Sequence, residues 1–223
     1  HPAADALYRE CLALCRELGN RWGEATCLHN LGVCAYEEGD HAAARARYGE
    51  SLALRREIGD QAGIAYSLNS LGAVAYGGGD HAGARALYAE SLALKRALDD
   101  RPGMAYSLLG LGLAARAMGD LRTARDAQRE ALEIRREIGD RIGIAGSLEA
   151  LADLADDPRH AATLYGAAAA LRARIGAPLP PTERPEHERR VARQEGRGER
   201  DAFRDAWERG GRLSLEEAVA EAL

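Results

Sequence analysis

Four cysteines lie near the start of the chain, and thiols have the widest chemistry of any side chains in this sequence. Cys11, Cys15, Cys27 and Cys34 are separated by three, eleven and six residues. Zinc binding is the first hypothesis for four thiols, because thiolates are strong zinc ligands. Zinc-binding sequences usually carry two cysteines separated by two residues, and no such pair occurs here. The spacing therefore does not predict a metal centre.

Other motifs that could support catalysis are incomplete. Glu186-His187-Glu188 lacks the second histidine of a metalloprotease helix, and Gly77-Gly78-Gly79-Asp80 lacks the lysine and the preceding strand of a phosphate-binding loop. No nucleophile, metal-ligand set or carboxylate pair is spaced as catalysis requires. The sequence predicts a protein that is not an enzyme and that uses no cofactor and no metal.

A repeat explains most of the chain. The dipeptide Gly-Asp returns every forty residues, at Gly39-Asp40, Gly79-Asp80 and Gly119-Asp120, and a second series that includes Gly59-Asp60 and Gly139-Asp140 lies half a period away. Such self-similarity is typical of a solenoid of stacked units. Glycine suits the left-handed residue that ends a helix, and aspartate caps the next helix. The sequence predicts an all-α solenoid of helical hairpins.

The repeat also gives the cysteines a packing role. Cys11 and Cys27 align with serines of other repeats, and Cys34 aligns with a valine and an alanine. Small buried side chains account for these positions without a metal. Cys15 aligns with basic residues, so we expect Cys15 alone to be exposed.

The order of residues within one period is specific. Leu71 and Gly72 precede the turn Gly79-Asp80, and Ala84 and Tyr88 follow it. This order resembles the tetratricopeptide repeat and matches in three consecutive periods. Gly72 and Ala84 would let two antiparallel helices approach closely, and Tyr88 would fill the space between one pair and the next.

The period exceeds the usual ~34 residues of this repeat. The segment 91–98 keeps a helical pattern, so the six extra residues are expected to lengthen the helices. Such repeats resemble the C-terminal arms of large bacterial signalling ATPases and of LuxR-type transcriptional regulators similar to the maltose-regulon activator. The segments 50–60, 63–68 and 206–223 carry this resemblance. It implies a regulatory or sensor arm; relatives carry an ATPase module and some a DNA-binding helix-turn-helix, and no phosphate-binding-loop motif occurs here.

The start of the chain aligns with a second helix. Residues 1–18 match 41–58 and 81–98, so the first helix of that repeat is missing. Without it, we expect this helix to expose its apolar face, including Leu7 and Leu14. The alignment and the absence of an initiator methionine favour a piece of a longer polypeptide.

The period sets the expected domain organisation. A tetratricopeptide-like superhelix is predicted over residues 1–176, with an orphan helix at 1–18 and repeats at 22–61, 62–101, 102–141 and 142–176. Prolines near residue 180 end it. Residues 177–223 are predicted to form capping helices near 183–195, 198–209 and 215–223, the last with a capping box of Ser214 and Glu217. Phe203, Trp207, Leu213 and Leu215 would cover the final repeat, and a separate binding role for this tail is the alternative.

The first helix of each pair lines the concave groove in this repeat class. Positions on this helix face vary between repeats, whereas the packing positions do not. Tyrosines, with amide, imidazole and guanidinium groups, suit a peptide or a small polar ligand. The predicted ligand- or partner-binding residues are His29, Tyr36, Tyr66, Asn69, Tyr76, Tyr106, Leu109 and Arg116. The series continues at Glu149 and Asp153 in the last repeat, and the alternative is a narrow groove filled by its own side chains or by water.

Composition limits the classes of partner. The net charge of −5 and the interleaved acidic and basic residues do not favour direct nucleic-acid binding by this chain. No apolar run approaches the ~18 residues of a membrane span, and no signal peptide is visible, so we expect a cytoplasmic location and no membrane partner.

Two functions remain. The first is a non-catalytic domain that binds a protein, a peptide or a small effector in the groove, as the arm of a larger signalling ATPase or transcriptional regulator. The alternative is a stand-alone scaffold or oligomerisation module, with self-association through the exposed helix 1–18.

Overall fold

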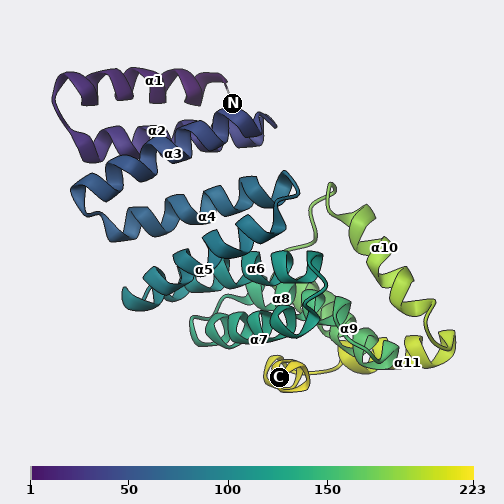
Figure 1. Ribbon diagram of the computed structural model, residues 1–223. Coiled ribbons are helices and arrows are strands. Elements are labelled where there is room, and N and C mark those ends of the chain that lie inside the picture. The colour runs from purple at the N-terminus through teal and green to yellow at the C-terminus, as the bar shows by residue number, and fades with distance from the viewer. Residues whose placement is uncertain (1) are drawn as a thin grey trace. The chain divides into compact units, whose positions relative to one another are not determined.

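The protein is built of α-helices joined by short turns. The computed structural model describes residues 2–223, with side chains from residue 3 onward, and contains no β-strand in this range. The helices are α1 (Pro2–Glu17), α2 (Arg21–Glu37), α3 (His41–Ile58), α4 (Gln61–Gly77), α5 (His81–Ala97), α6 (Arg101–Ala117), α7 (Leu121–Glu137), α8 (Arg141–Asp153), α9 (Pro158–Ile175), α10 (Arg184–Glu195), α11 (Arg200–Gly211) and α12 (Leu215–Ala222) (Figure 1). The all-α prediction is confirmed.

The repeating dipeptides form the turns, as predicted. Gly79 has a φ of +81°, in the left-handed region that L-residues with side chains avoid. The carboxylate of Asp80 accepts a hydrogen bond of 2.9 Å from the Gly83 amide and caps α5. Equivalent capping bonds begin α2, α3, α4, α6, α7 and α8. Each capping side chain satisfies one of the free amides of the first helical turn.

The extra length of the period lies in the helices, again as predicted. Helices α4, α5, α6 and α7 each have 17 residues, and at ~1.5 Å per residue each is about 25 Å long. In the described part of the chain, no helix combines the length and the apolar character that crossing a membrane requires.

Residues 1–119 form one compact unit, here called unit 1, and residues 120–223 form unit 2. In unit 1, glycines and tyrosines set the distance between helices. A Cβ atom added at Gly32 would lie 2.6 Å from Cε1 of Tyr48, and one added at Gly72 would lie 2.9 Å from Cε1 of Tyr88. Gly110 faces the same Tyr88 ring from α6. Tyr88 thus packs between successive pairs, as expected.

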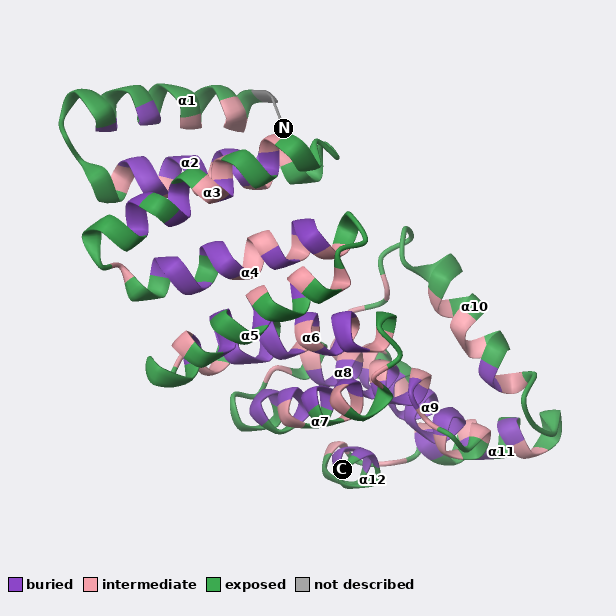
Figure 2. Ribbon diagram, viewed as in Figure 1, coloured by how far each residue is buried: buried purple, intermediate pink, exposed green. Residues whose placement is uncertain are grey.

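The first helix of unit 1 is covered on one side only. Leu12 and Cys15 of α1 are buried against α2, together with Leu28 and Leu31. The opposite face is exposed (Figure 2), with Leu7 at 65% and Leu14 at 57% of full exposure. The expectation that this face of α1 would be uncovered is confirmed.

Unit 2 has one larger core. Buried residues of α7, α8, α9 and α12 form a single cluster that includes Leu148, Leu164 and Tyr165. Helix α11 crosses α9 at close range, because Gly210 faces the Thr163 backbone and Gly166 faces that of Trp207. The predicted capping box begins α12, where Ser214 and Glu217 exchange hydrogen bonds.

The predicted tail residues contact this core. Phe203 is buried, and Trp207, Leu213 and Leu215 are partly buried against the clusters of unit 2. These contacts join the tail to α8 and α9, whereas its role as a cap of the solenoid stays a prediction.

Candidate functional site

The eight predicted binding residues lie on the corresponding face of three helices. All of them lie on α2, α4 or α6 in unit 1, and none is fully buried. We call this surface the groove face. Helices α4 and α6 contact each other directly, and a hydrogen bond of 3.0 Å runs from the Ser107 hydroxyl to the Asn69 side-chain oxygen. The first helices α4 and α6 of two successive repeats therefore share a continuous surface.

Tyrosines provide most of the accessible area of the groove face. The side chains of Tyr66 and Tyr106 lie in equivalent positions and are 49% and 65% exposed. Tyr36 packs on His41 with ring centroids 5.4 Å apart, and the equivalent ring of Tyr76 packs on His81 at 5.2 Å. Half of these rings are thus held in place by a neighbouring helix. Flat rings of fixed orientation are efficient contact surfaces because they lose little entropy on binding.

His29 contributes shape to the groove face but no positive charge. Its ring packs on Tyr48, with centroids 5.0 Å apart. Burial, with a smaller effect of the Arg55 charge, lowers the pKa of His29 to about 4. The imidazole is therefore neutral at neutral pH, so it offers a flat, uncharged polar surface.

A buried ammonium group lies beneath the middle of the groove face. Lys95 is 1% exposed, and its Nζ lies 5.1 Å from the centre of the Tyr66 ring and donates a hydrogen bond of 3.0 Å to Ser107. Because Ser107 donates in turn to Asn69, the ammonium is linked to the accessible amide. Burial lowers the pKa of Lys95 to about 8, and Asp100 opposes this effect. Leu109 and Arg116 complete the surface on α6 and are half-buried.

Lys95 belongs to a series that the sequence analysis missed. Arg55 and Arg135 occupy the same position in the neighbouring repeats and are also buried. Arg55 donates to the Gly63 carbonyl at 2.6 Å. Arg135 donates to Ser147 at 2.5 Å. We call this position of the repeat the cation position. Its sequence signal is a basic residue eight positions before a glycine. A Cβ atom added at Gly63 or Gly143 would lie within 2.7 Å of the arginine side chain.

The same comparison corrects the expectation for Cys15. This residue stands at the cation position and was expected to be exposed, yet it is buried. A Cβ atom added at Gly23 would lie 2.6 Å from its Sγ, so the thiol occupies the space that the glycine leaves open. Cys11 is the exposed cysteine. Cys27 and Cys34 are buried, as expected.

In unit 2, the positions equivalent to the groove face are occupied by the chain itself. Glu149 aligns with Asn69 and Leu109, and it forms two hydrogen bonds with Arg172, at 2.7 and 3.0 Å. Asp153, one turn later, accepts a bond of 2.7 Å from Arg190 of α10. Gln194 of α10 donates to the Ala152 carbonyl at 3.0 Å. Helices α9 and α10 therefore supply the side chains that occupy this face of α8.

A cavity of about 340 Å³ adjoins this contact. It is lined by Glu149, Ala169, Arg172, Ala173, Gly176, Pro178, Leu179 and His187. Burial lowers the pKa of His187, whose ring meets Tyr165 edge-on, with centroids 5.5 Å apart. The cavity is open to solvent beside a charged pair that is already satisfied, so it offers apolar contact more than new hydrogen bonds.

Known proteins share the repeat and the fold. The family model for the tetratricopeptide repeat matches residues 1–57 and 63–137. No curated protein matches the chain at a significant level. The crystal structure of BtubC (BKLC) from P. vanneervenii is similar with a TM-score of 0.75 and 16% identity, over 98% of this chain and 92% of that one. A Podosopora anserina structure described as a kinesin light chain of nearly identical TPR-like repeats has a TM-score of 0.59 and 14% identity, over 78% and 87%. These likenesses concern the fold.

Proposed function

The chain belongs to the tetratricopeptide repeat family, and on that premise we propose that its groove face binds a peptide segment of a partner protein. Stacked helical repeats expose extended surfaces of this kind and use them for recognition. The accessible tyrosines of α4 and α6 supply the apolar contact, and Asn69 supplies a hydrogen-bonding group. The proposed role is binding, without chemistry.

One observation carries this proposal. Helix α10 is held on the equivalent face of α8 by Arg190 and Gln194. In unit 2 this face therefore accommodates a peptide segment that carries basic and amide groups. In unit 1 the positions of Glu149 and Asp153 hold uncharged residues such as Asn69 and Leu109, and tyrosines lie beside them. We therefore expect a different sequence to bind there, with apolar contacts dominant.

The test is selection of peptides from a displayed library against the intact chain, followed by measurement of their affinity for variants. The double variant Tyr66→Ala and Tyr106→Ala is expected to weaken binding about tenfold or more, the usual effect of removing interface aromatics. Circular dichroism should show unchanged helix content, because both rings are largely exposed. Ile58→Ala, which removes an exposed apolar group from α3, serves as the control. Unchanged affinity in a folded double variant contradicts the proposal, and a small effector that competes with the peptide would extend it.

We also propose, at a finer level, that this binding regulates a larger signalling ATPase or transcriptional regulator in the cytoplasm. The recurring segments at 50–60 and 63–68 and the closing segment at 206–223 support this assignment through their resemblance to such arms. Sequencing the reading frame on both sides of the chain tests it. A phosphate-binding-loop motif upstream would support the assignment. A reading frame that holds this chain alone would contradict it and leave a stand-alone scaffold.

The second candidate function is self-association through α1. What favours it is the exposed apolar stripe formed by Leu7 and Leu14 of α1 and by Leu18 just after it. Two such helices could cover each other, as symmetric oligomers do with a shared patch.

A further inference from the structure

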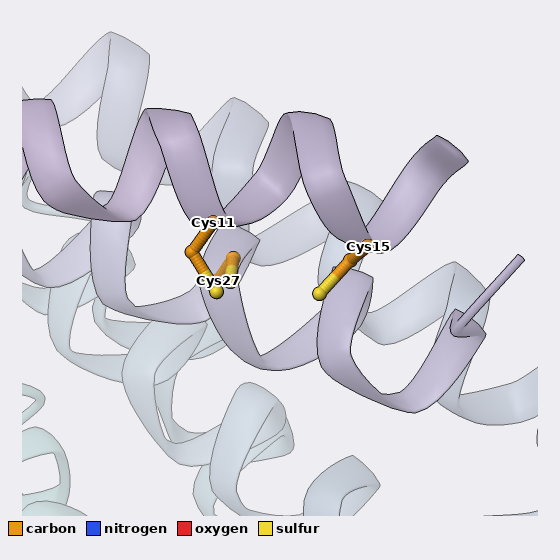
Figure 3. A group of neighbouring side chains, drawn as sticks. All are labelled: Cys11, Cys15 and Cys27. Atoms are coloured by element: carbon orange, nitrogen blue, oxygen red, sulfur yellow. The ribbon is translucent and has the colours of Figure 1, made fainter. Parts of the chain in front are cut away.

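Three of the four thiols come together between α1 and α2. Cys11 and Cys15 lie one turn apart on α1, and Cys27 lies on α2 (Figure 3). Their Sγ atoms all lie within 4.8 Å of one another. We call these residues the thiol cluster. The linear spacing gives no sign of it, because one ligand is contributed by a neighbouring helix.

The repeat shows what the thiol cluster replaces. The three equivalent residues are Ser51, Arg55 and Ser67 in the next repeat and Ser91, Lys95 and Ser107 in the one after. In each of these sets a buried cation lies beside hydroxyl groups. The Lys95 ammonium donates to Ser107 at 3.0 Å, and the two serine oxygens are 3.0 Å apart. Packing therefore explains a small residue at positions 11 and 27, but it does not explain a thiol at the cation position.

The charged groups around the cluster also differ from those of the other repeats. Glu24 is buried, at 8% exposure, where the other repeats have Ile64, Met104 and Ile144. Arg16 and Arg21 reach Glu24 from the surface, at 2.9 and 3.2 Å. The first repeat has thus lost its buried cation at Cys15 and gained a buried carboxylate nearby. Because Arg16 and Arg21 already compensate Glu24, it is the loss of the cation at Cys15 that makes the space between α1 and α2 more favourable for a positive ion.

We propose that Cys11, Cys15 and Cys27 bind one thiophilic metal cation, Zn²⁺ or Cu⁺, which takes the place of the buried Lys or Arg of the other repeats. Sulfur ligands prefer these ions over harder ones. With Zn–S bonds of ~2.3 Å and tetrahedral angles, ligating sulfurs lie about 3.8 Å apart. Small rotations of the cysteine side chains reach this separation from the present one. A solvent molecule would complete the coordination on the exposed side of Cys11.

Metal binding at the thiol cluster would compete with protons, because the thiolate is the ligand. A bound cation must displace the thiol protons, so metal affinity is expected to fall as the pH is lowered.

The test is a titration of the reduced, metal-free chain with Co²⁺ without oxygen, followed by competition with Zn²⁺. The expected result is about one equivalent bound, a sulfur-to-cobalt charge-transfer band in the near ultraviolet, and loss of that band when Zn²⁺ is added. Zn²⁺ should also raise the midpoint of thermal unfolding, because the ion joins α1 to α2.

The repeat supplies matched variants that should fold. Cys15→Arg recreates the arrangement of Arg55, and Cys27→Ser recreates Ser107. Both are expected to abolish the charge-transfer band and the thermal shift. Cys34→Val recreates Val74, outside the cluster, and should leave both unchanged.

Two results would overturn the proposal. The first is a cobalt spectrum that lacks the sulfur-to-cobalt band in the reduced chain, or that has this band equally in the Cys15→Arg variant. The other is an intact mass showing that two cluster thiols form a disulfide under mild oxidation, in a chain that binds no Co²⁺ or Zn²⁺ when reduced.

Discussion

Buried cations are the least expected residues of this molecule. Arg55, Lys95 and Arg135 lie between one helical pair and the next, where most solenoid residues are small or apolar. Each donates to a serine hydroxyl, and Arg55 and Arg135 also donate to a glycine carbonyl. Burying a charge is costly even when it is hydrogen-bonded. The hydrogen bonds to serine and glycine offset part of that cost.

The ammonium of Lys95 should make stability depend on pH. Its folded pKa is about 8, below the ordinary value of 10.5. Between these values the unfolded chain binds a proton that the folded chain does not, so the free energy of unfolding rises with pH by about 3 kcal/mol through this group. Below about pH 8 both states are protonated, and the contribution is constant.

Urea unfolding at pH 7 and pH 10 measures this effect. The wild type is expected to gain about 2.5 kcal/mol relative to Lys95→Met between the two values. Tyr48 and Tyr88, whose pKa burial raises to about 12, titrate in both proteins and cancel in the difference. An equal difference at both pH values would show that Lys95 is solvated in the folded state.

At the scale of the helix, one turn departs from the rule. Glycines with positive φ close α1, α2, α3, α4, α6 and α7, but Asp99, with a φ of +52°, closes α5. A residue with a side chain pays about 1–2 kcal/mol in this region. Glycine avoids that cost but loses more entropy on folding.

Asp99→Gly is therefore expected to increase the free energy of unfolding by about 1 kcal/mol. Gly79→Asp, the reverse change at the equivalent turn, should decrease it by a similar amount. Urea denaturation curves of the two variants and of Asp99→Asn, which removes the charge and keeps the side chain, separate conformation from electrostatics. Stabilisation by Asp99→Asn equal to that by Asp99→Gly would assign the effect to charge.

Helix order and boundaries were predictable because they depend on local chemistry. The Gly-Asp turns and the capping box of α12 need only residues within a few positions of each other. The burial of Cys15 and the position of Lys95 beneath Tyr66 were not predictable in this way. They depend on which residue of the next helix, such as Gly23, leaves space for them. The groove-face residues were placed on the correct helices, whereas their binding role stays a prediction.

At the scale of the molecule, the two units differ in how their cores are built. In unit 1, buried residues form local clusters, each shared by neighbouring helices. In unit 2, one cluster joins α7, α8, α9 and α12. Local clusters are typical of a repeat array, in which each unit is stabilised by its neighbours. At an uncovered end of such an array, one helix face is exposed to solvent, and α1 presents such a face.

The exposed stripe of α1 predicts self-association. Leu7, Leu14 and Leu18 are 65%, 57% and 80% exposed, and pairing would remove these groups from water. Light scattering after size exclusion should give a mass that rises with concentration. Leu7→Glu with Leu14→Glu should return it to that of one chain. The pair Ile58→Glu and Ile138→Glu, at exposed ends of α3 and α7, is the control. A concentration-independent mass of one chain for the wild type would reject this contact.

The turns described above have a genetic consequence. Each helix from α2 to α8 carries its own capping side chain at its start, and the residue that closes each preceding helix lies immediately before that cap. Every junction is thus encoded within a few codons. Unequal recombination between two copies of the forty-residue repeat would add or delete a complete hairpin and leave every remaining junction intact. The length of this array can therefore change between generations in whole repeats, without the invention of any new turn.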